Sequence, residues 1–212
     1  NQINYRNEYL KTYEEFINRP NMHYDGTLPI EKRDDNEYEL SFRNVSFCYP
    51  GTEDYILKNV SLDFKIGQKM ALVGRNGAGK TTLIKLIEGL YRPTAGSILI
   101  DKMPIETFDG KSLRGSIATV MQKPVHYSFT IAENILLREV QNDTDRRCVQ
   151  KVLEESGLWE RVSHFPKGMD SVLGKEFDEE GIELSGGESQ KLAIARALYE
   201  DAGVLILDEP AN

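Results

Sequence analysis

Residues 74–82 have types and spacing that suit phosphate binding, because Gly-Arg-Asn-Gly-Ala-Gly-Lys-Thr-Thr fits the pattern G-x-x-x-x-G-K-[ST]. Gly77 and Gly79 carry no Cβ, so successive backbone N–H groups can point inward at phosphate oxygens. Lys80 supplies a mobile positive charge for the outer phosphates, and Thr81 offers a hydroxyl to Mg²⁺. A glycine turn before an ordinary helix is the alternative. The full motif favours a nucleotide site, with ATP and Mg²⁺ as its ligands.

Two acidic residues follow an apolar run near the other end of the sequence. Val204–Leu207 precede Asp208 and Glu209. A buried parallel strand would deliver both carboxylates to its carboxyl end, where ligands collect in α/β sheets. Asp208 is predicted to hold Mg²⁺ directly or through water, and Glu209 to orient the water that attacks the γ-phosphate. A strand end capped by acids is the alternative, but the phosphate loop favours catalysis.

A second anion-receiving helix end is predicted at Leu184-Ser185-Gly186-Gly187-Glu188. Ser185 is a good N-cap for a helix over residues 187–199, and the two glycines leave backbone N–H groups accessible. One nucleotide cannot easily use both this helix end and the phosphate loop. A symmetric head-to-tail dimer resolves the problem, since the ATP of each loop would meet Ser185 and Gly187 of the other copy. A plain capped helix is the alternative.

The elements that must position these motifs follow from hydrophobic periodicity. An apolar run before Gly74 predicts a buried strand, and helical periodicity follows it from Lys80. Residues 1–20 have apolar side chains at helical spacing, and this helix either packs on its own domain or continues a segment outside the sequence. The other predicted elements are strands within 38–47, 60–64, 96–101, 116–121 and 204–207, and helices at 130–139 and 144–156.

The charge, the cysteine spacing and the length of the apolar runs limit which classes of protein fit this sequence. Lys plus Arg number 26 against 34 Asp plus Glu, a net charge of −8 without a basic stripe, which argues against nucleic acid as the main partner. Cys48 and Cys148 are isolated thiols without metal-ligand spacing. No apolar run is long enough to span a membrane, and the first residues lack a signal-peptide pattern. We expect the chain as given to be soluble and cytosolic.

The order and spacing of Tyr49, residues 74–82, Gln122, residues 184–188 and residues 207–209 resemble the nucleotide-binding domain of ATP-binding cassette (ABC) transporters. The resemblance implies an α/β fold: a P-loop NTPase core with a mostly parallel sheet, an N-terminal antiparallel β subdomain and an inserted α-helical subdomain at about 125–185. It also implies that Tyr49 stacks on adenine and that Gln122 links Mg²⁺ and water to a mobile loop. Glutamine is commoner than glutamate at position 188, a departure expected to matter little.

The motifs and the resemblance together predict a set of site residues. The catalytic residues are Glu209, Lys80 and Gln122, and the magnesium ligands are Thr81, Gln122 and Asp208. The nucleotide-binding residues are Tyr49, Gly74, Arg75, Asn76, Gly77, Ala78, Gly79, Lys80, Thr81, Thr82, Gln122, Ser185, Gly186, Gly187 and Glu188.

Residues 91–96, 113–114, 130–135 and 173–177 are similar to exporters whose membrane helices precede the ATPase on one polypeptide. This branch implies a helical extension and linker at 1–37, an ATPase domain at 38–212, and action at the cytoplasmic face of the plasma membrane. Its partners would be a second ATPase domain and a membrane-spanning domain of the same polypeptide. Two alternatives stay open: a soluble cassette ATPase acting on nucleic acid or ribosomes, and a nucleotide-gated dimerisation module without useful turnover.

In the family's fold, the strand after Asp208 and Glu209 lies between that strand and the one leading into the phosphate loop. A chain ending at residue 212 would leave a gap in the sheet, and unpaired central backbone is costly. We therefore expect the sequence to be a fragment of a longer product.

Overall fold

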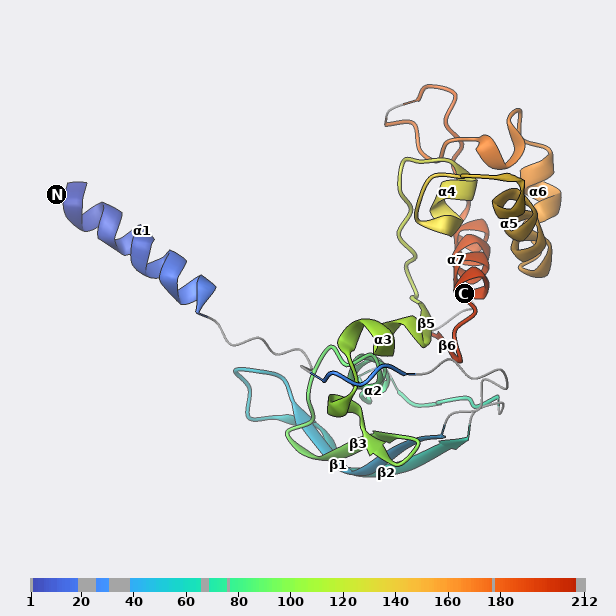
Figure 1. The fold of residues 1–212 in the computed structure, drawn as a ribbon. Helices are drawn as coiled ribbons and strands as arrows, with labels where there is room; N and C mark the ends of the chain where they lie inside the picture. The colour runs from blue at the N-terminus through green and yellow to red at the C-terminus, as the bar shows by residue number, and fades with distance from the viewer. Residues whose placement is uncertain are drawn as a thin grey trace.

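The computed structural model describes residues 2–18, 26–30, 39–65, 69–75, 77–176 and 178–208. Asn76 and Glu209, predicted above to bind nucleotide and to act as the catalytic base, lie outside the described residues. The fold is a mixed α/β arrangement with an N-terminal antiparallel sheet, a parallel sheet and a group of helices, which confirms the predicted class (Figure 1).

The antiparallel sheet has the strand order β2-β1-β3-β4. Apolar residues alternate along strand β1 on either side of an irregularity at Asn44, which has φ of 51°. The register shift there allows Phe42, Val45 and Phe47 all to be buried in the core. The predicted antiparallel strands are therefore confirmed. The strands are β1 (Glu39–Cys48), β2 (Tyr55–Lys65), β3 (Ala95–Ile100) and β4 (Met103–Pro104).

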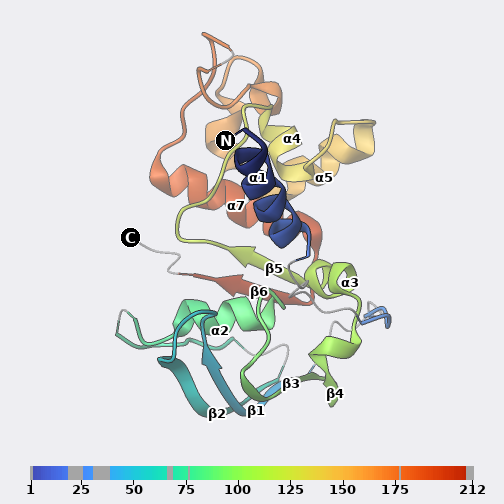
Figure 2. The ribbon, with the colours of Figure 1, turned by 90° about the vertical axis from the view of Figure 1, so that its left-hand side faces the viewer.

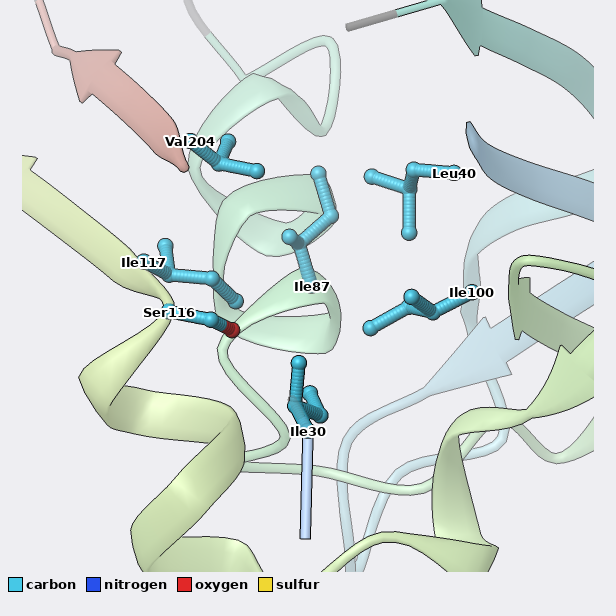
Figure 3. Close-up of a pocket in the computed structure, with 7 residues that line it drawn as sticks. All are labelled: Ile30, Leu40, Ile87, Ile100, Ser116, Ile117 and Val204. Atoms are coloured by element: carbon cyan, nitrogen blue, oxygen red, sulfur yellow. The ribbon is translucent and has the colours of Figure 1, made fainter. Parts of the chain in front are cut away.

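Helix α2 (Lys80–Ile87) lies between the antiparallel sheet and a parallel pair, β5 (Ile117–Val120) and β6 (Val204–Leu207) (Figure 2). Leu83, Leu86 and Ile87 of this helix are buried in the main apolar cluster. Figure 3 shows a small apolar pocket around Ile87, with β1 and β3 on one side and β5 and β6 on the other. The pocket is lined by Ile30, Leu40, Ile87, Ile100, Ser116, Ile117 and Val204.

Helices α4, α5, α6 and α7 lie together in Figure 1 and form the helical region, residues 131–200. Side chains of this region form a second apolar cluster. Local capping starts its helices: Thr130 and Glu133 form a capping box, and the Asn142 side chain accepts from the Asp145 amide. The elements are α4 (Ile131–Leu136), α5 (Asp143–Glu155), α6 (Trp159–Ser163), the 3₁₀ turn η2 (Gly168–Asp170) and α7 (Gly186–Glu200).

The predicted N-terminal helix exists as α1 (Gln2–Ile17), which lies apart from the other elements (Figure 1). Tyr13, Phe16 and Ile17 are exposed, so the described residues do not cover the apolar face of this helix. No helix in the described ranges is both long and apolar enough to cross a membrane.

A short segment, residues 26–30, docks on the 3₁₀ turn η1 (Ile105–Thr107) and the helix α3 (Gly110–Gly115). The Leu28 N–H donates to the Thr107 carbonyl, and the Leu28 carbonyl accepts from the Asp109 N–H. Ile30 then enters the pocket of Figure 3, so this segment becomes part of the core.

The prediction of a buried strand before the phosphate loop is wrong for the described residues. Residues 69–75 form no strand, and Val73 is 91% exposed. Strand β6 forms as predicted and pairs with β5, but Leu205 and Leu207 are more than 40% exposed, so it is not a fully buried strand. The physical reason is the same for both stretches: strand hydrogen bonds and burial come from neighbouring strands, and within the described residues only β5 pairs with β6.

Candidate functional site

The phosphate loop ends where α2 begins. Gly79 is the N-cap residue of α2 and has a left-handed backbone, with φ of 89°. A Cβ at this position would lie 2.9 Å from Leu57 Cδ2 of strand β2. The positive φ therefore favours glycine, and a Cβ would also force the Leu57 side chain to move. The positive end of the α2 dipole faces the loop.

The Lys80 side chain folds over this loop. Its Nζ donates to the Gly74 carbonyl at 2.7 Å and to the Arg75 carbonyl at 3.3 Å. The loop also closes on itself, since the Ala78 N–H donates to the Arg75 carbonyl at 3.1 Å. The ammonium group thus lies beside the glycine-rich turn, where a polyphosphate would need a positive charge.

Thr81 and Asp208 are brought together although they are 127 residues apart. The Thr81 hydroxyl donates to Asp208 Oδ2 at 3.3 Å. Mg²⁺ prefers oxygen ligands and is commonly held by one or two protein groups together with waters and phosphate oxygens. The two side chains fit that requirement, so two of the three predicted magnesium ligands lie at one place.

Gln122 and Asp208 emerge from the same edge of the parallel sheet. Val120 pairs with Leu207 in register, and the Asp208 N–H donates to the Val120 carbonyl at 2.9 Å. Gln122 follows β5 by two residues and is exposed. Gln122 therefore lies near the carboxyl ends of both strands, as the sequence predicts.

Tyr49 is connected to the start of α2. Its hydroxyl lies 3.1 Å from the buried Thr82 hydroxyl, and Lys85 Nζ lies 5.6 Å from the centre of its ring. Edge-to-face contacts with Phe47 and Tyr91 hold the ring, with centroids 5.0 and 5.2 Å away. The aromatic residue predicted to stack on adenine thus borders the phosphate loop, and the stacking itself stays a prediction.

The second predicted anion site lies at the start of α7. Ser185 is the N-cap, and a complete capping box joins it to Glu188. The Ser185 N–H donates to Glu188 Oε2 at 2.8 Å, and the Glu188 N–H donates to Ser185 Oγ at 3.3 Å. The Ser189 N–H reaches the Ser185 carbonyl, as in an ordinary helix.

Among the residues that the structure describes, the N–H groups of Gly186 and Gly187 are therefore the unpaired donors in the first turn of α7. Both glycines are exposed, and no atom lies within 4 Å of where a Cβ would be. Two adjacent amides at the positive end of a 15-residue helix can receive an anion.

The two anion-receiving ends are separate within one chain. Among the described residues, no hydrogen bond or ion pair joins residues 185–188 to residues 74–82. This separation is consistent with each end contacting the nucleotide of a different copy.

The carboxylate of Glu188 has an ion-pair partner that the sequence motifs did not reveal. Arg161 Nε lies 3.1 Å from Glu188 Oε1. Hydrogen bonding from the Ser185 amide and the nearby Arg161 charge lower the pKa of Glu188, so this side chain is ionised at neutral pH. The two residues are 27 positions apart on different helices, so no local spacing pattern could have predicted the contact.

Residues 57–212 match a family model described as ABC transporter. The ATP-dependent lipid A-core flippase of Nitrosococcus oceani is 42% identical over 170 residues, which are 80% of this chain and 28% of that protein. The nisin transport ATP-binding protein NisT of Lactococcus lactis subsp. lactis is 40% identical over 79% of this chain and 28% of that protein. The chain therefore spans less than a third of the length of these relatives.

A solved structure of similar fold is that of a bacterial Atm1-family ABC exporter with ATP bound. It superposes with a TM-score of 0.81 at 30% sequence identity, covering 97% of this chain and 35% of that chain. Another relative, the ABC multidrug transporter atrD of Emericella nidulans, is 41% identical over 86% of this chain and 13% of that protein.

Proposed function

The chain belongs to the ABC transporter family, and we propose that it is the ATP-binding and hydrolysing domain of an exporter. The observation that carries the proposal is the Thr81–Asp208 contact, which joins the phosphate loop to the acidic strand end. The relatives named as a flippase, a nisin transport protein and a multidrug transporter support the export direction.

We propose the following roles for the residues at and around the phosphate loop. Lys80 and the loop amides bind the β- and γ-phosphates, and Tyr49 stacks on the adenine. Thr81, Asp208 and Gln122 would hold Mg²⁺, which supplies charge neutralisation on the phosphate oxygens when bound. Glu209 orients a water molecule and takes its proton as the water oxygen attacks the γ-phosphorus, releasing ADP and phosphate.

The start of α7 in a second copy would complete the nucleotide-binding site of the first copy. The free N–H groups of Gly186 and Gly187, with the Ser185 hydroxyl, form a compact donor set for the γ-phosphate. This arrangement supports a head-to-tail dimer closed by two ATP molecules. Hydrolysis then removes the shared phosphate contacts, and the dimer opens.

Residues 1–37 are proposed as the link to a membrane-spanning domain, and residues 38–212 as the ATPase domain. The exposed apolar face of α1 supports an attachment outside the described residues. The domain would work at the cytoplasmic face of a membrane, and opening and closing of the dimer would move the membrane domain.

The test is the variant Glu209→Gln. An amide cannot accept the proton but keeps the size of the side chain, so we expect ATP binding to persist, turnover to fall by at least about 100-fold, and ATP-bound dimers to accumulate. Phosphate release and analytical ultracentrifugation with MgATP measure both quantities. Turnover near that of the unsubstituted protein would refute the assignment of the base. Dimerisation by ATP in the absence of any turnover in the unsubstituted protein would instead indicate a nucleotide-gated dimerisation module.

A further inference from the structure

The start of α7 combines an anion-receiving helix end with a fixed negative charge. Glu188 folds back on the N-cap, with Oε2 at 2.8 Å from the Ser185 N–H. Its carboxylate therefore lies within one helical turn of the free amides of Gly186 and Gly187. A carboxylate so close to these donors repels a phosphate that approaches them.

Arg161 provides the opposite charge from a neighbouring helix. Its Nε lies 3.1 Å from Glu188 Oε1, and its guanidinium lies over the ring of Phe165 with 4.9 Å from Cζ to the ring centroid. Phe165 is buried in the core of the helical region, so it forms a fixed platform. The stacking and the ion pair together orient the arginine toward the start of α7.

We propose that Arg161 is a positioning residue for the phosphate site at the start of α7. By pairing with Glu188, it offsets the carboxylate charge and holds the capping box closed, so that Gly186 and Gly187 can accept the triphosphate of a second copy. The inference rests on the proposed head-to-tail dimer. It also means that glutamate at position 188 changes the electrostatics of the site, contrary to the expectation from sequence.

The proposal predicts how affinity follows the local charge. The Arg161–Glu188 pair is neutral, Glu188→Gln leaves a net charge of +1, Arg161→Ala leaves −1, and the double variant is neutral again. Glutamine keeps an oxygen that can accept from the Ser185 N–H, so the cap survives the substitution. ATP-driven dimerisation should therefore be strongest in Glu188→Gln, similar in the double variant and the parent, and weakest in Arg161→Ala.

The experiment uses the protein with Glu209→Gln as the parent, so that hydrolysis does not deplete the dimer. Sedimentation with MgATP at low and high salt gives the dimer dissociation constant of each variant. We expect Arg161→Ala to weaken dimerisation about threefold to tenfold at low salt, since the pair is partly exposed to solvent. High salt should reduce the difference, because it screens charge. ATP binding by the monomer should not change.

Arg146→Ala is the matched control. Arg146 also lies in the helical region and is 43% exposed, against 56% for Arg161, but it pairs at 2.8 Å with Asp170 and not with the start of α7. Its loss should leave the dimer unaffected, and Arg161→Lys should restore part of the affinity lost in Arg161→Ala.

The outcomes separate the two proposals. A parent that does not dimerise with ATP overturns the dimer and this inference together. If the parent dimerises and Arg161→Ala behaves like Arg146→Ala, only the role of Arg161 is refuted. If Glu188→Gln weakens dimerisation, or if the weakening caused by Arg161→Ala does not depend on salt, the charge of the pair does not act on the site.

Discussion

The helical region and the stretch that leads into the phosphate loop differ in how they bury apolar side chains. In the helical region, Leu153, Leu158 and Val162 are almost completely inaccessible to solvent. Before the phosphate loop, Leu72 and Val73 are at least half exposed. The start of α7 is thus supported by a closely packed core, whereas the phosphate loop follows a stretch that packs on little of the described chain.

The comparison shows that the two anion-receiving ends differ in preorganisation. At the start of α7, the capping box, the Arg161–Glu188 pair and the packed core fix the donors in place. At the phosphate loop, the fixed parts are Gly79 and α2, while Lys80 holds the loop through its carbonyls. Three pairs of substitutions test how the regions of the molecule differ.

The largest effect is expected from removing a leucine in each region. Leu153→Ala should lower the free energy of unfolding by about 3 kcal/mol, because it removes a fully buried side chain and leaves a cavity. Leu72→Ala should lower it by less than about 1 kcal/mol, because that side chain is already 50% exposed. Urea unfolding followed by circular dichroism measures both values. Equal losses would mean that Leu72 is buried in solution and that the two regions do not differ.

The second-largest effect separates the role of the phosphate loop in ATP binding from the role of the start of α7 in dimerisation. Lys80→Ala should weaken ATP binding by a single copy about 100-fold, since a charged contact to phosphate is lost. Ser185→Ala should leave that binding within about twofold and weaken only ATP-driven dimerisation, with about 1 kcal/mol of stability lost from the cap. Isothermal titration calorimetry and sedimentation measure the two steps. A large loss of monomer affinity in Ser185→Ala would place both ends on one nucleotide.

The smallest effect concerns a charge pair that stabilises the helical region. Asp145 accepts from both Arg138 Nη atoms, at 2.7 and 2.8 Å, and from the Gln141 N–H. These hydrogen bonds hold the pKa of Asp145 below its ordinary value. A carboxyl group with a lowered pKa in the folded state stabilises the fold above its unfolded pKa, near 4, and this contribution is lost as the pH falls below that value.

Asp145→Asn should therefore lower the urea midpoint at pH 7, and the difference from the unsubstituted protein should shrink as the pH is lowered from about 4 to about 2.5, toward the folded pKa of Asp145. Asp63→Asn is the control, since Asp63 forms an exposed pair with Arg43 on the antiparallel sheet and should change the midpoint little at either pH. A difference for Asp145→Asn that is the same at both pH values would exclude the charge of Asp145 as its cause.

Much of the chemistry was predictable from local sequence. The motif at 74–82, the serine N-cap with Glu188 three residues later, and the apolar run before Asp208 all lie within short segments. Interactions over three or four residues decide helix starts and turn conformations, so α2, α7 and their caps formed where the sequence predicted.

The sequence by itself predicted which residues bind phosphate and magnesium, and it determined where the helices that present them begin. Only the tertiary structure decided which distant residues meet: Thr81 with Asp208, Arg161 with Glu188, and Ile30 with the pocket beside α2. It also decided that residues 69–75 form no strand, although their composition favours one. The physical reason is that a strand is stabilised by neighbours supplied from elsewhere in the chain, whereas a helix satisfies most of its hydrogen bonds within its own segment.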